Sequence, residues 1–436
     1  MLTHKAGSTQ GGGVPNGPLD GIRVVDLTVA WSGPGATALL GDLGAEVIRM
    51  EGNDRPSRQV SAALTKEAVR NSWQGATFPD RDPGARPYDR YAVFNWHARN
   101  KLAACVNLDT PEGHDAAVKL LKISDVFVEN NARDTLEKLG LGHEEMMELN
   151  PRLIVARMPP LGMTGPMSDY LGYGPNFNAL VGVGSIDGYE GEGPESAGDN
   201  NHMDEVSPAG LAFAVIAALW DRERTGRGVL IEFSQAENLM QNLGESYLDW
   251  QMNHRLPPIR GNTDAHFLQD VYPAEGDDRW VAISIRDDRD WAELTRVIGP
   301  APWLAAGDDS EQRKENSAQL RGSIAEWTAN RSPEEIVPAL QARGIPAGEV
   351  MSETRLLTDE HLRARQWFHE RSHASVGTYQ YPGWPWRASG FDLAYGRPLP
   401  AFGEDNEYVY KELLGYTDDE FDALVDRKLI TDEQLA

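Results

Sequence analysis

The spacing of apolar residues predicts alternating strands and helices in the first half of the chain. Short runs rich in β-branched residues predict buried strands, and turns and stretches of helical periodicity separate them. The strands are expected at 22–28, 45–51, 102–109, 125–130 and 151–158, with a helix over 36–44 after the first of them. Because βαβ units place helices on both faces of a sheet, this alternation predicts a parallel, doubly wound sheet.

Two further helices have ends that can be read in the sequence. Thr110 followed by Pro111 is a favoured combination for an N-cap and a first helical position. Ser207 and Pro208 form the same combination ahead of a strongly apolar run, and Gly226 follows that run as a candidate helix C-cap. The second helix is therefore expected to start at Pro208, with two acidic residues just before it.

The pattern changes in the middle of the chain. A strand at 280–285 and an acidic helix near Trp291 predict a smaller α+β domain within 226–340. The part over 341–436 is rich in loops with short strands, and the first 18 residues have no apolar signal core and read as a flexible tail. The large domain is expected to begin at residue 19 and to run to residue 225.

Composition narrows the classes of function. The chain has 436 residues and a net charge of −26, from 67 acidic and 41 basic residues, which disfavours binding to nucleic acid or to anionic membranes. No apolar run reaches the roughly 20 residues of a membrane helix. Cys105 is the one cysteine, so no internal disulfide can form, and a cytoplasmic location is favoured. The histidines have no metal-binding spacing, and no metal is expected.

One motif suggests a dinucleotide. Gly33, Gly35 and Ala38 fit G-x-G-x-x-A after a strand, and Glu51 ends the next strand, where an acid would bind the ribose. This layout favours an NAD-dependent oxidoreductase as an alternative function. However, five residues separate the strand from the first glycine, and Pro34 lacks an N–H for a phosphate. The glycines could equally form a tight turn without a ligand, or the exposed backbone could bind a different ligand.

Several longer stretches resemble one family. These are GIRVVDLTVAWSGPGATALLGDLGAEVIRME (21–51), RNKLAACVNLDTPEG (99–113), SDVFVENNARDTLEKLGLG (124–142) and MDEVSPAGLAFAVIAALWDRERTGRGVLIEFSQAE (203–237). In this order they resemble the family III CoA-transferases, to which the α-methylacyl-CoA racemases are related. The resemblance extends from about residue 18 to about residue 430, because RGNTD, GIPAGEV and LLGYTDDE also match.

The resemblance implies a fold and an activity. The fold would be α/β, with a Rossmann-like large domain built from both chain ends, a smaller α+β middle domain, and two ring-shaped chains interlocked in a homodimer. Residues 341–436 would return to the large domain. The activity would be transfer of coenzyme A from an acyl-CoA to a small carboxylic acid, with the CoA thioester as a substrate and with no metal or redox cofactor.

The resemblance also implies a catalytic aspartate. Asp204 stands 18 positions before Arg222, as the nucleophile of the transferases does. It would attack the acyl-CoA thioester to give a mixed anhydride, and the released CoA thiolate would convert the anhydride to an aspartyl-CoA thioester. The start of the following helix would favour the ionised carboxylate through the helix dipole. The neighbouring Glu205 is expected to face solvent.

Contacts to coenzyme A follow from the same resemblance. Trp31 and Ser32 match a backbone contact near the thiol end, and further contacts match along the chain. These are Leu108 and Asp109 on the adenine side, the loop of Asn130, Asn131 and Ala132, Lys138 for a phosphate, and the nearby positive charges of Arg49, Arg99 and Lys101. An acidic protein needs such a local cluster of cations to hold a phosphorylated ligand.

Two other functions stay open within the family. In the racemases the histidine of a G-H-D motif is one acid/base, and Tyr173 and Gly174 stand here where that histidine and the following aspartate would be. Tyrosine is a weak base near neutral pH, which disfavours racemase chemistry. The chain could also be an inactive CoA-binding subunit of a heteromeric transferase. The glycine-rich stretch 182–193 is expected to be either a mobile loop over the acyl group or a simple turn.

Overall fold

The computed structural model describes residues 17–193, 195, 201–391, 393 and 396–436, so the expected tail lies outside it except for Gly17 and Pro18. The chain forms two compact units. The first comprises residues 1–181, 199–248 and 363–436, and the second comprises 182–198 and 249–362. These divisions fall later than the expected ones at 225 and 340. A strand after residue 226 still belongs to the first unit, and a strand beyond residue 340 still pairs within the second unit.

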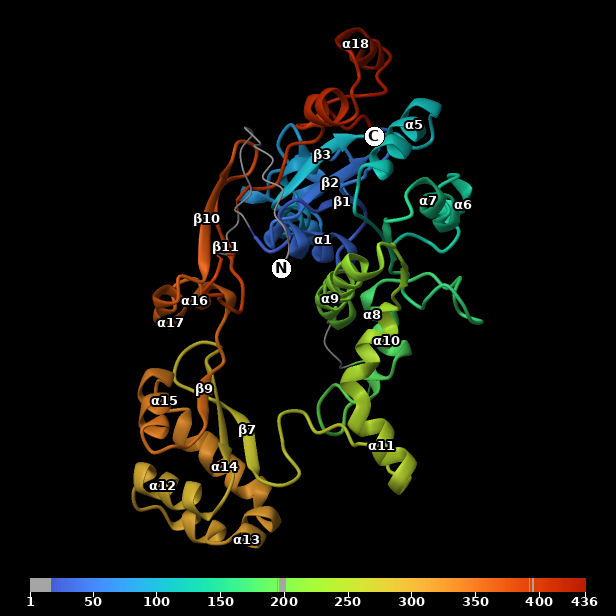
Figure 1. Ribbon diagram of the computed structural model, residues 1–436. Coiled ribbons are helices and arrows are strands. Elements are labelled where there is room, and N and C mark those ends of the chain that lie inside the picture. The colour runs from blue at the N-terminus through green and yellow to red at the C-terminus, as the bar shows by residue number, and fades with distance from the viewer. Residues whose placement is uncertain (1–16, 194, 196–200, 392, 394–395) are drawn as a thin grey trace. The chain divides into compact units, whose positions relative to one another are not determined.

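The first unit contains a parallel sheet of six strands (Figure 1). Its order is β3-β2-β1-β4-β5-β6, and all neighbouring strands run parallel. The strands are β1 (Arg23–Leu27), β2 (Glu46–Glu51), β3 (Lys101–Cys105), β4 (Val126–Glu129), β5 (Ile154–Arg157) and β6 (Leu230–Glu232). This is the doubly wound order, which reverses direction between β1 and β4, and ligands of such sheets bind at the carboxyl ends of the strands near that reversal. The parallel sheet predicted from the sequence is therefore confirmed.

Helices cover both faces of this sheet, as alternate side chains along each strand require. One apolar cluster joins Val24, Val47 and Val126 to α1 and α9. The other joins Val25, Ile48 and Phe127 to α5 and to residues near the C-terminus, including Tyr410, Phe421 and Leu424. The helices of this unit are α1 (Ser32–Asp42), α2 (Lys66–Arg70), α3 (Pro87–Arg90), α4 (Ala92–His97), α5 (Pro111–Lys122), α6 (Thr135–Lys138), α7 (His143–Leu149), α8 (Gly174–Leu180), α9 (His202–Thr225), α10 (Gln235–Met240) and α18 (Asp418–Asp426). The first half of α11 (Gly244–Asn253) and the end of α17 (Glu360–Ala364) also belong to it.

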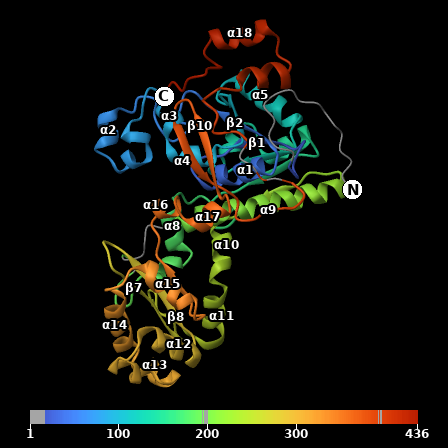
Figure 2. The same cartoon turned by 90° about the vertical axis from the view of Figure 1, so that its left-hand side faces the viewer.

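The second unit has an antiparallel sheet of three strands, in the order β7-β8-β9 (Figure 2). The strands are β7 (Leu268–Pro273), β8 (Trp280–Ile285) and β9 (Ala347–Glu349), and the helices are α12 (Asp288–Ile298), α13 (Ser310–Glu315), α14 (Ser317–Thr328), α15 (Pro333–Gln341) and α16 (Glu353–Leu356). Trp291, Leu294 and Ile324 join the sheet in one apolar core. The expected strand at 280–285 and the helix near Trp291 are both confirmed. A separate hairpin of β10 (Phe368–His373) and β11 (Gly377–Pro382) belongs to the first unit.

Some predicted element boundaries were wrong. β3 ends at Cys105 rather than at residue 109, because the backbone turns at Asn107 to enter α5. The capping of α5 is confirmed, since the Thr110 hydroxyl accepts a hydrogen bond from the Gly113 N–H at 3.1 Å. α1 starts at Ser32, four residues before the predicted start. Its first turn tolerates Pro34 because the first N–H groups of a helix have no partner within the helix.

The start of α9 also differs from the prediction. The helix begins at His202 with Asn201 as its N-cap residue, so Asp204 lies inside the first turn and Pro208 inside the helix. Ser207 caps nothing, and its buried hydroxyl has no hydrogen-bond partner among the described residues. Pro208 lacks the N–H that would bond the Asp204 carbonyl four residues earlier. The predicted end is confirmed, with Gly226 at a φ of 72°.

Candidate active site

Three segments that follow or flank sheet strands meet at Asp204. Ser32 is the first residue of α1, after β1, and Gln235 is the first residue of α10, after β6. Asp204 is the third residue of α9, which packs against α1 along one face of the sheet. The first turns of α1 and α9 therefore meet where the sheet reverses its strand order, which is the usual location of a ligand site in such sheets.

The contacts at Asp204 are short. The Ser32 hydroxyl oxygen lies 2.5 Å from Oδ1 of Asp204 and 2.6 Å from Oε1 of Gln235. The Gln235 side-chain amide donates to the Met158 carbonyl at 2.8 Å. Ser32 and Gln235 are buried, with 1% and 3% of their surface exposed, whereas Asp204 is half-buried. One carboxylate oxygen is thus held by a buried hydroxyl that has a second acceptor behind it.

Burial raises the pKa of the Asp204 carboxyl above its ordinary value. The hydrogen bond from Ser32 lowers this pKa, and the negative charge of Glu205 raises it further. Among the described residues, no basic side chain contributes to this shift in pKa. The sequence suggested that the helix start would favour the ionised form. Inside the folded chain the loss of water outweighs such an effect, and the carboxylate is less stable and more reactive as a result.

Gly174 packs against the other oxygen of the carboxylate. A Cβ atom at this position would lie 2.5 Å from Oδ2 of Asp204 and 2.8 Å from Oδ1 of Asn201. Gly174 opens α8, and its neighbour Tyr173 has 78% of its surface exposed. Because residue 174 has no side chain, its backbone can lie beside Oδ2, the oxygen of Asp204 that Ser32 does not hold.

Gly174→Ala is expected to lower kcat/KM for CoA transfer by at least about tenfold, because a misplacement of a reacting group by an ångström costs that much or more. The methyl group must push the Asp204 carboxylate away from its place. Steady-state kinetics with an acyl-CoA and an acid would measure the loss. Gly244→Ala is the matched control, since a Cβ there meets no atom within 4 Å. Equal kinetics in the two variants would contradict the packing of Gly174 on the reacting carboxylate.

The loop between β1 and α1 is held in place by the residue after β4. Asn130 accepts from the Val29 N–H at 2.7 Å and donates to the Val29 carbonyl at 2.9 Å. Asn131 donates to the Leu27 carbonyl at 3.0 Å. A Cβ at Gly33 would lie 2.6 Å from Cβ of Thr28 and 2.8 Å from Cγ of Asn130. Gly33 therefore permits the close approach of this loop, which positions Ser32.

The same geometry weighs against a dinucleotide on the glycine motif. A Cβ at Gly35 would lie 2.9 Å from Cγ of Pro208, so this glycine allows α1 to pack closely on α9. Glu51, the acid expected on a ribose, is 1% exposed and pairs with Arg58 at 2.6 Å and with Arg49 at 2.9 Å. The motif is explained by packing, and the acid is already neutralised by two guanidinium groups.

Three of the predicted cations for coenzyme A lie in the core. Arg49, Arg99 and Lys101 have between 1% and 7% of their surface exposed. Arg49 and Lys101 pair with Asp26, and Arg99 pairs with Asp42 at 2.7 Å. Because buried charges need partners of opposite sign, these side chains have a structural role that the sequence did not reveal. A phosphate contact by any of them stays a prediction.

The other predicted contacts are more accessible. Trp31 is half-buried, with its ring centroid 5.5 Å from that of His97, and Leu108 is buried. Asp109 is exposed and pairs with Arg55 at 2.9 Å, which places a cation next to the predicted adenine side. Ala132 is exposed, and Lys138 pairs with Asp134 on the surface at 2.7 Å. The structure brings Ser32 to Asp204 and leaves the roles of Trp31 and the others as predictions.

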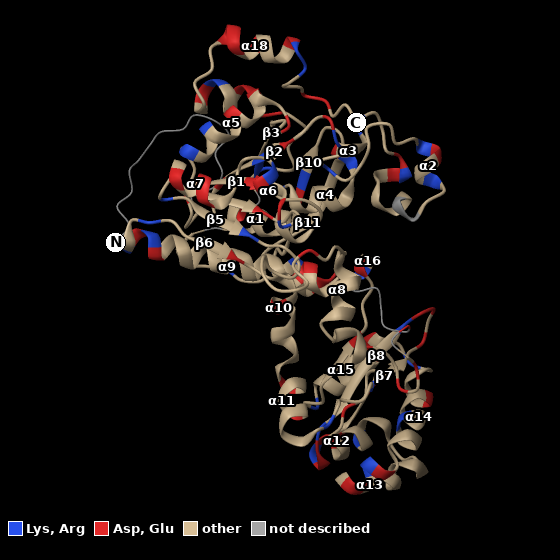
Figure 3. Ribbon diagram, turned by 90° about the vertical axis from the view of Figure 1, so that its right-hand side faces the viewer, with Lys and Arg blue, Asp and Glu red and all other residues tan. Residues whose placement is uncertain are grey.

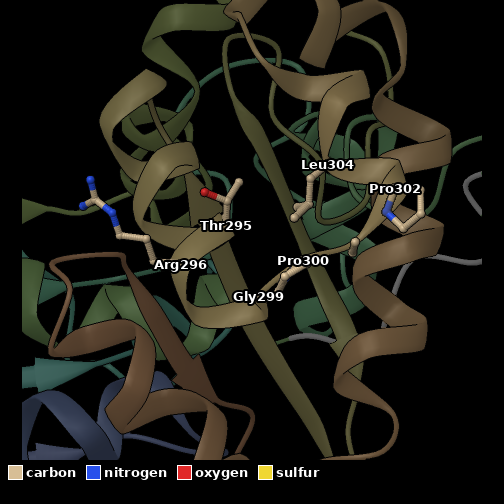
Figure 4. A pocket seen from close by; sticks show the side chains of 7 residues that line it. Thr295, Arg296, Gly299, Pro300, Pro302 and Leu304 are labelled. Carbon is tan, nitrogen blue, oxygen red and sulfur yellow. The ribbon is translucent and has the colours of Figure 1, made fainter.

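No other chemistry is visible in the described part of the chain. Its residues contain no group of three or more His, Cys, Asp or Glu that could hold a metal ion. Figure 3 shows acidic and basic residues interleaved along the ribbon of both units. An open hollow in the second unit, drawn in Figure 4, is lined by Thr295, Arg296 and five Gly, Ala, Pro and Leu residues. Arg296 pairs there with Glu293, and Thr295 has the one hydroxyl among these seven lining residues.

Gln235 and the hydroxyl of Ser32 were not predicted as site groups. Ser32 was expected to contribute only its backbone, and Gln235 stood only within a longer motif. A signal was present for Gln235, because SQAE has the Ser and Glu spacing of a helix start just after a strand. The Ser234 hydroxyl does accept from the Glu237 N–H at 3.3 Å. The first residue of a helix that follows a strand in this way lies at the carboxyl edge of the sheet.

The sequence model of the protein family described as "CoA-transferase family III" matches residues 19–406 of this chain. The chain is 30% identical to the "Probable CoA-transferase Rv1866" of Mycobacterium tuberculosis over 95% of its own length but only 50% of that protein. It is 29% identical to the "Succinyl-CoA--D-citramalate CoA-transferase" of Chloroflexus aurantiacus, over 95% of this chain and 99% of the relative. The crystal structure of a CAIB/BAIF family protein from Brucella suis shares the fold, with a TM-score of 0.77 at 23% identity, over 91% of this chain and 100% of that one. The chain is therefore an enzyme that belongs to CoA-transferase family III.

Proposed function

We propose that this enzyme moves coenzyme A from an acyl-CoA donor to a small carboxylic acid by way of Asp204. The observation that carries the proposal is the half-buried carboxylate of Asp204, whose Oδ1 is held by Ser32 and whose Oδ2 lies beside the backbone of Gly174. Burial that raises the pKa of Asp204 also raises the energy of the ionised nucleophile. Such an oxygen is suited to attack a thioester carbonyl.

The atoms balance over two exchanges. Oδ2 of Asp204 attacks the thioester carbon, a C–O bond forms, and the C–S bond breaks to release CoA as a thiolate. The thiolate attacks Cγ of Asp204, the bond from Cγ to Oδ2 breaks, and the donor acid leaves as a carboxylate. The acceptor acid then repeats both steps in reverse. Each turnover therefore replaces one oxygen of Asp204.

The substrates are proposed by class. One relative, which this chain matches over nearly the relative's full length, is named as a CoA-transferase for succinyl-CoA and D-citramalate. We propose succinyl-CoA as the first donor to test, with acetyl-CoA and formyl-CoA beside it, and a panel of small mono- and dicarboxylic acids as acceptors. Mass spectrometry of the acyl-CoA products identifies the transferred acid. Hydrolysis of every donor without any new acyl-CoA would contradict a transferase that uses these acids.

The acidic limb of the pH profile tests the carboxylate. The nucleophile must be ionised, so kcat/KM is expected to rise with pH through a pKa above the ordinary value of about 4 for aspartate. Glu205 raises the pKa of Asp204, so Glu205→Gln is expected to shift this limb to lower pH. Glu144→Gln, an exposed acid on α7, is the control and should leave the limb unchanged. A limb that does not move in Glu205→Gln would separate the rate from the ionisation of Asp204.

We also propose that the enzyme is a homodimer. α9 is long and apolar enough, by length and composition, to cross a membrane. Its inner face packs on α1, and Arg222 near its end pairs with Asp125 at 2.9 Å, as in a core helix. Its outer face exposes Phe213 by 74% and Trp220 by 67%, and a second copy is proposed to cover them. The mass in solution, compared for the native chain and Phe213→Glu, tests this assembly.

The remaining expectations are proposals of the same kind. The Asp204 chemistry uses only a carboxylate and the CoA thioester, so we propose that the enzyme works without a metal or redox cofactor. A net charge of −26 and a lone buried cysteine fit a cytoplasmic enzyme without nucleic acid or membrane partners. Activity after prolonged dialysis against a metal chelator checks the first of these points.

A further inference from the structure

The Ser32 hydroxyl has two acceptors and one proton. It lies 2.5 Å from Oδ1 of Asp204 and 2.6 Å from Oε1 of Gln235, and an ionised carboxylate and an amide oxygen are both acceptors only. A rotated Gln235 amide would not relieve this shortage of protons. Its oxygen would then face the Met158 carbonyl, to which the amide nitrogen now donates at 2.8 Å. The proton of Ser32 can therefore bond only one of the two oxygens at a time.

The proposed reaction changes the charge on Oδ1. In the anhydride and in the aspartyl-CoA thioester, Oδ1 is the uncharged carbonyl oxygen of the aspartyl group and a modest acceptor. When the CoA thiolate or the acceptor carboxylate attacks Cγ, the electron pair of that carbonyl moves to Oδ1, which becomes an oxyanion. A hydrogen bond aimed at a position where charge develops is worth much more in the transition state than before it.

We propose, on the basis of the proposed Asp204 chemistry, that Ser32 is a catalytic residue whose hydroxyl donates to Oδ1 when it becomes an oxyanion, and that Gln235 is a positioning residue that accepts the same hydrogen bond while Oδ1 is uncharged. The proton stays on the Ser32 oxygen throughout this step. The hydroxyl rotates between two oxygens at nearly equal distances, 2.5 Å for Oδ1 of Asp204 and 2.6 Å for Oε1 of Gln235. The burial of Ser32 and Gln235 keeps water from replacing either bond.

The residues that contact Ser32 and Gln235 each have a defined role. Asn130 and Gly33 fix the loop that brings the Ser32 hydroxyl to Asp204. The Met158 carbonyl fixes which end of the Gln235 amide faces Ser32. Ser32 thus serves the steps at Cγ of Asp204, because it contacts Oδ1. The attack of Oδ2 on the donor thioester places charge on the acyl oxygen instead.

The test measures the rate at which CoA becomes attached to Asp204. Native enzyme is mixed with one equivalent of succinyl-CoA, or of whichever donor gives transfer, quenched in acid at successive times, and digested, and the CoA adduct on the peptide with Asp204 is counted by mass spectrometry. Ser32→Ala is expected to form this adduct about 100-fold more slowly, the usual loss of one oxyanion donor. Ser32→Thr keeps the hydroxyl and should recover most of the rate. Gln235→Ala should lose less than Ser32→Ala. Steady-state kinetics should show the loss in kcat rather than in KM.

The outcomes separate this inference from the proposed function. Adduct formation in Ser32→Ala within threefold of the native rate would overturn the role of Ser32 and leave Asp204 as the nucleophile. An equal loss in folded Ser32→Thr and Ser32→Ala would assign the effect to shape rather than to the hydroxyl, and would also overturn it. A native enzyme that transfers CoA but never carries the adduct would contradict the Asp204 chemistry itself. Thermal unfolding of each variant shows which of them are folded.

Discussion

Asp204→Asn is expected to lose CoA transfer by on the order of 10⁴-fold or more, the usual cost of removing a nucleophile. The amide is close in shape to the carboxylate and can still accept from Ser32, but its oxygen is a poor nucleophile and its nitrogen cannot form the anhydride. Exchange of CoA between two acids, followed by mass spectrometry, measures the loss. Glu205→Gln is the matched control one residue away, and it should retain transfer at neutral pH.

The same variant is expected to be more stable at neutral pH. Burial raises the pKa of Asp204 in the folded chain, so the folded state favours the protonated acid. The penalty for ionisation appears as pH rises through the unfolded pKa of about 4, and it is complete above the folded pKa. Asp204→Asn carries no charge and escapes this penalty. Its melting temperature should exceed that of the native chain at pH 7, and the difference should vanish well below pH 4.

Retained transfer in Asp204→Asn would contradict the catalytic assignment, whatever the stability does. A variant that is inactive and also less stable at pH 7 would contradict the claim that the fold strains this carboxylate. The two readouts are independent, because the first depends on the nucleophile and the second on its desolvation.

Lys101→Met is expected to destabilise the protein by about 3–5 kcal/mol, the cost of removing one partner of a buried ion pair. Lys101 is 1% exposed, and its Nζ lies 2.8 Å from Oδ2 of Asp26, from the Pro34 carbonyl and from the Thr37 hydroxyl. Burial raises the pKa of Asp26, but Lys101 and Arg49 outweigh this and lower it to about 2. Without Lys101, the Asp26 charge remains buried with less compensation.

Denaturant unfolding and the KM for acyl-CoA together decide the role of Lys101. A structural role predicts a large loss of stability and an unchanged KM in the protein that stays folded. A phosphate contact, as the sequence suggested, predicts the reverse. Lys314→Met is the control, since Lys314 is an exposed residue of α13 and is not among the predicted CoA contacts, so little stability is at stake there. In the native chain the stability due to Asp26 should be lost as pH falls from about 4 towards 2, since its folded pKa lies below its unfolded one.

Much of the fold could be predicted because each strand in the first half of the chain is a separate apolar run in the sequence. Their order in the sheet does not follow from the same pattern, since no local feature says that β1 lies between β2 and β4. The error at α9 has a definite cause. Ser207 and Pro208 resemble a helix start, but Pro208 only interrupts a helix that already began at His202.

The candidate site divides in the same way. Asp204 could be found because the residues around it resemble a family motif, and Ser32 was found as a position but not as a hydroxyl. Gln235 reaches Ser32 only because β6 joins the sheet and α10 begins at its end. The burial of Arg49, Arg99 and Lys101 depends on Asp26 and Asp42, which approach them through the packing of β1 and α1. Pairings of this kind are invisible to residue type and spacing.

The attachment of substrate oxygen to Asp204 is the most direct test of the account. The enzyme would be allowed to turn over with succinyl-CoA, or another active donor, and an acceptor acid labelled with oxygen-18 in both carboxylate oxygens. The account predicts that one oxygen-18 replaces one oxygen-16 in the digested peptide that contains Asp204. Fragmentation should place this label on residue 204 rather than on Glu205, and Asp204→Asn should gain no label. Continued CoA transfer with no label on Asp204 would contradict it.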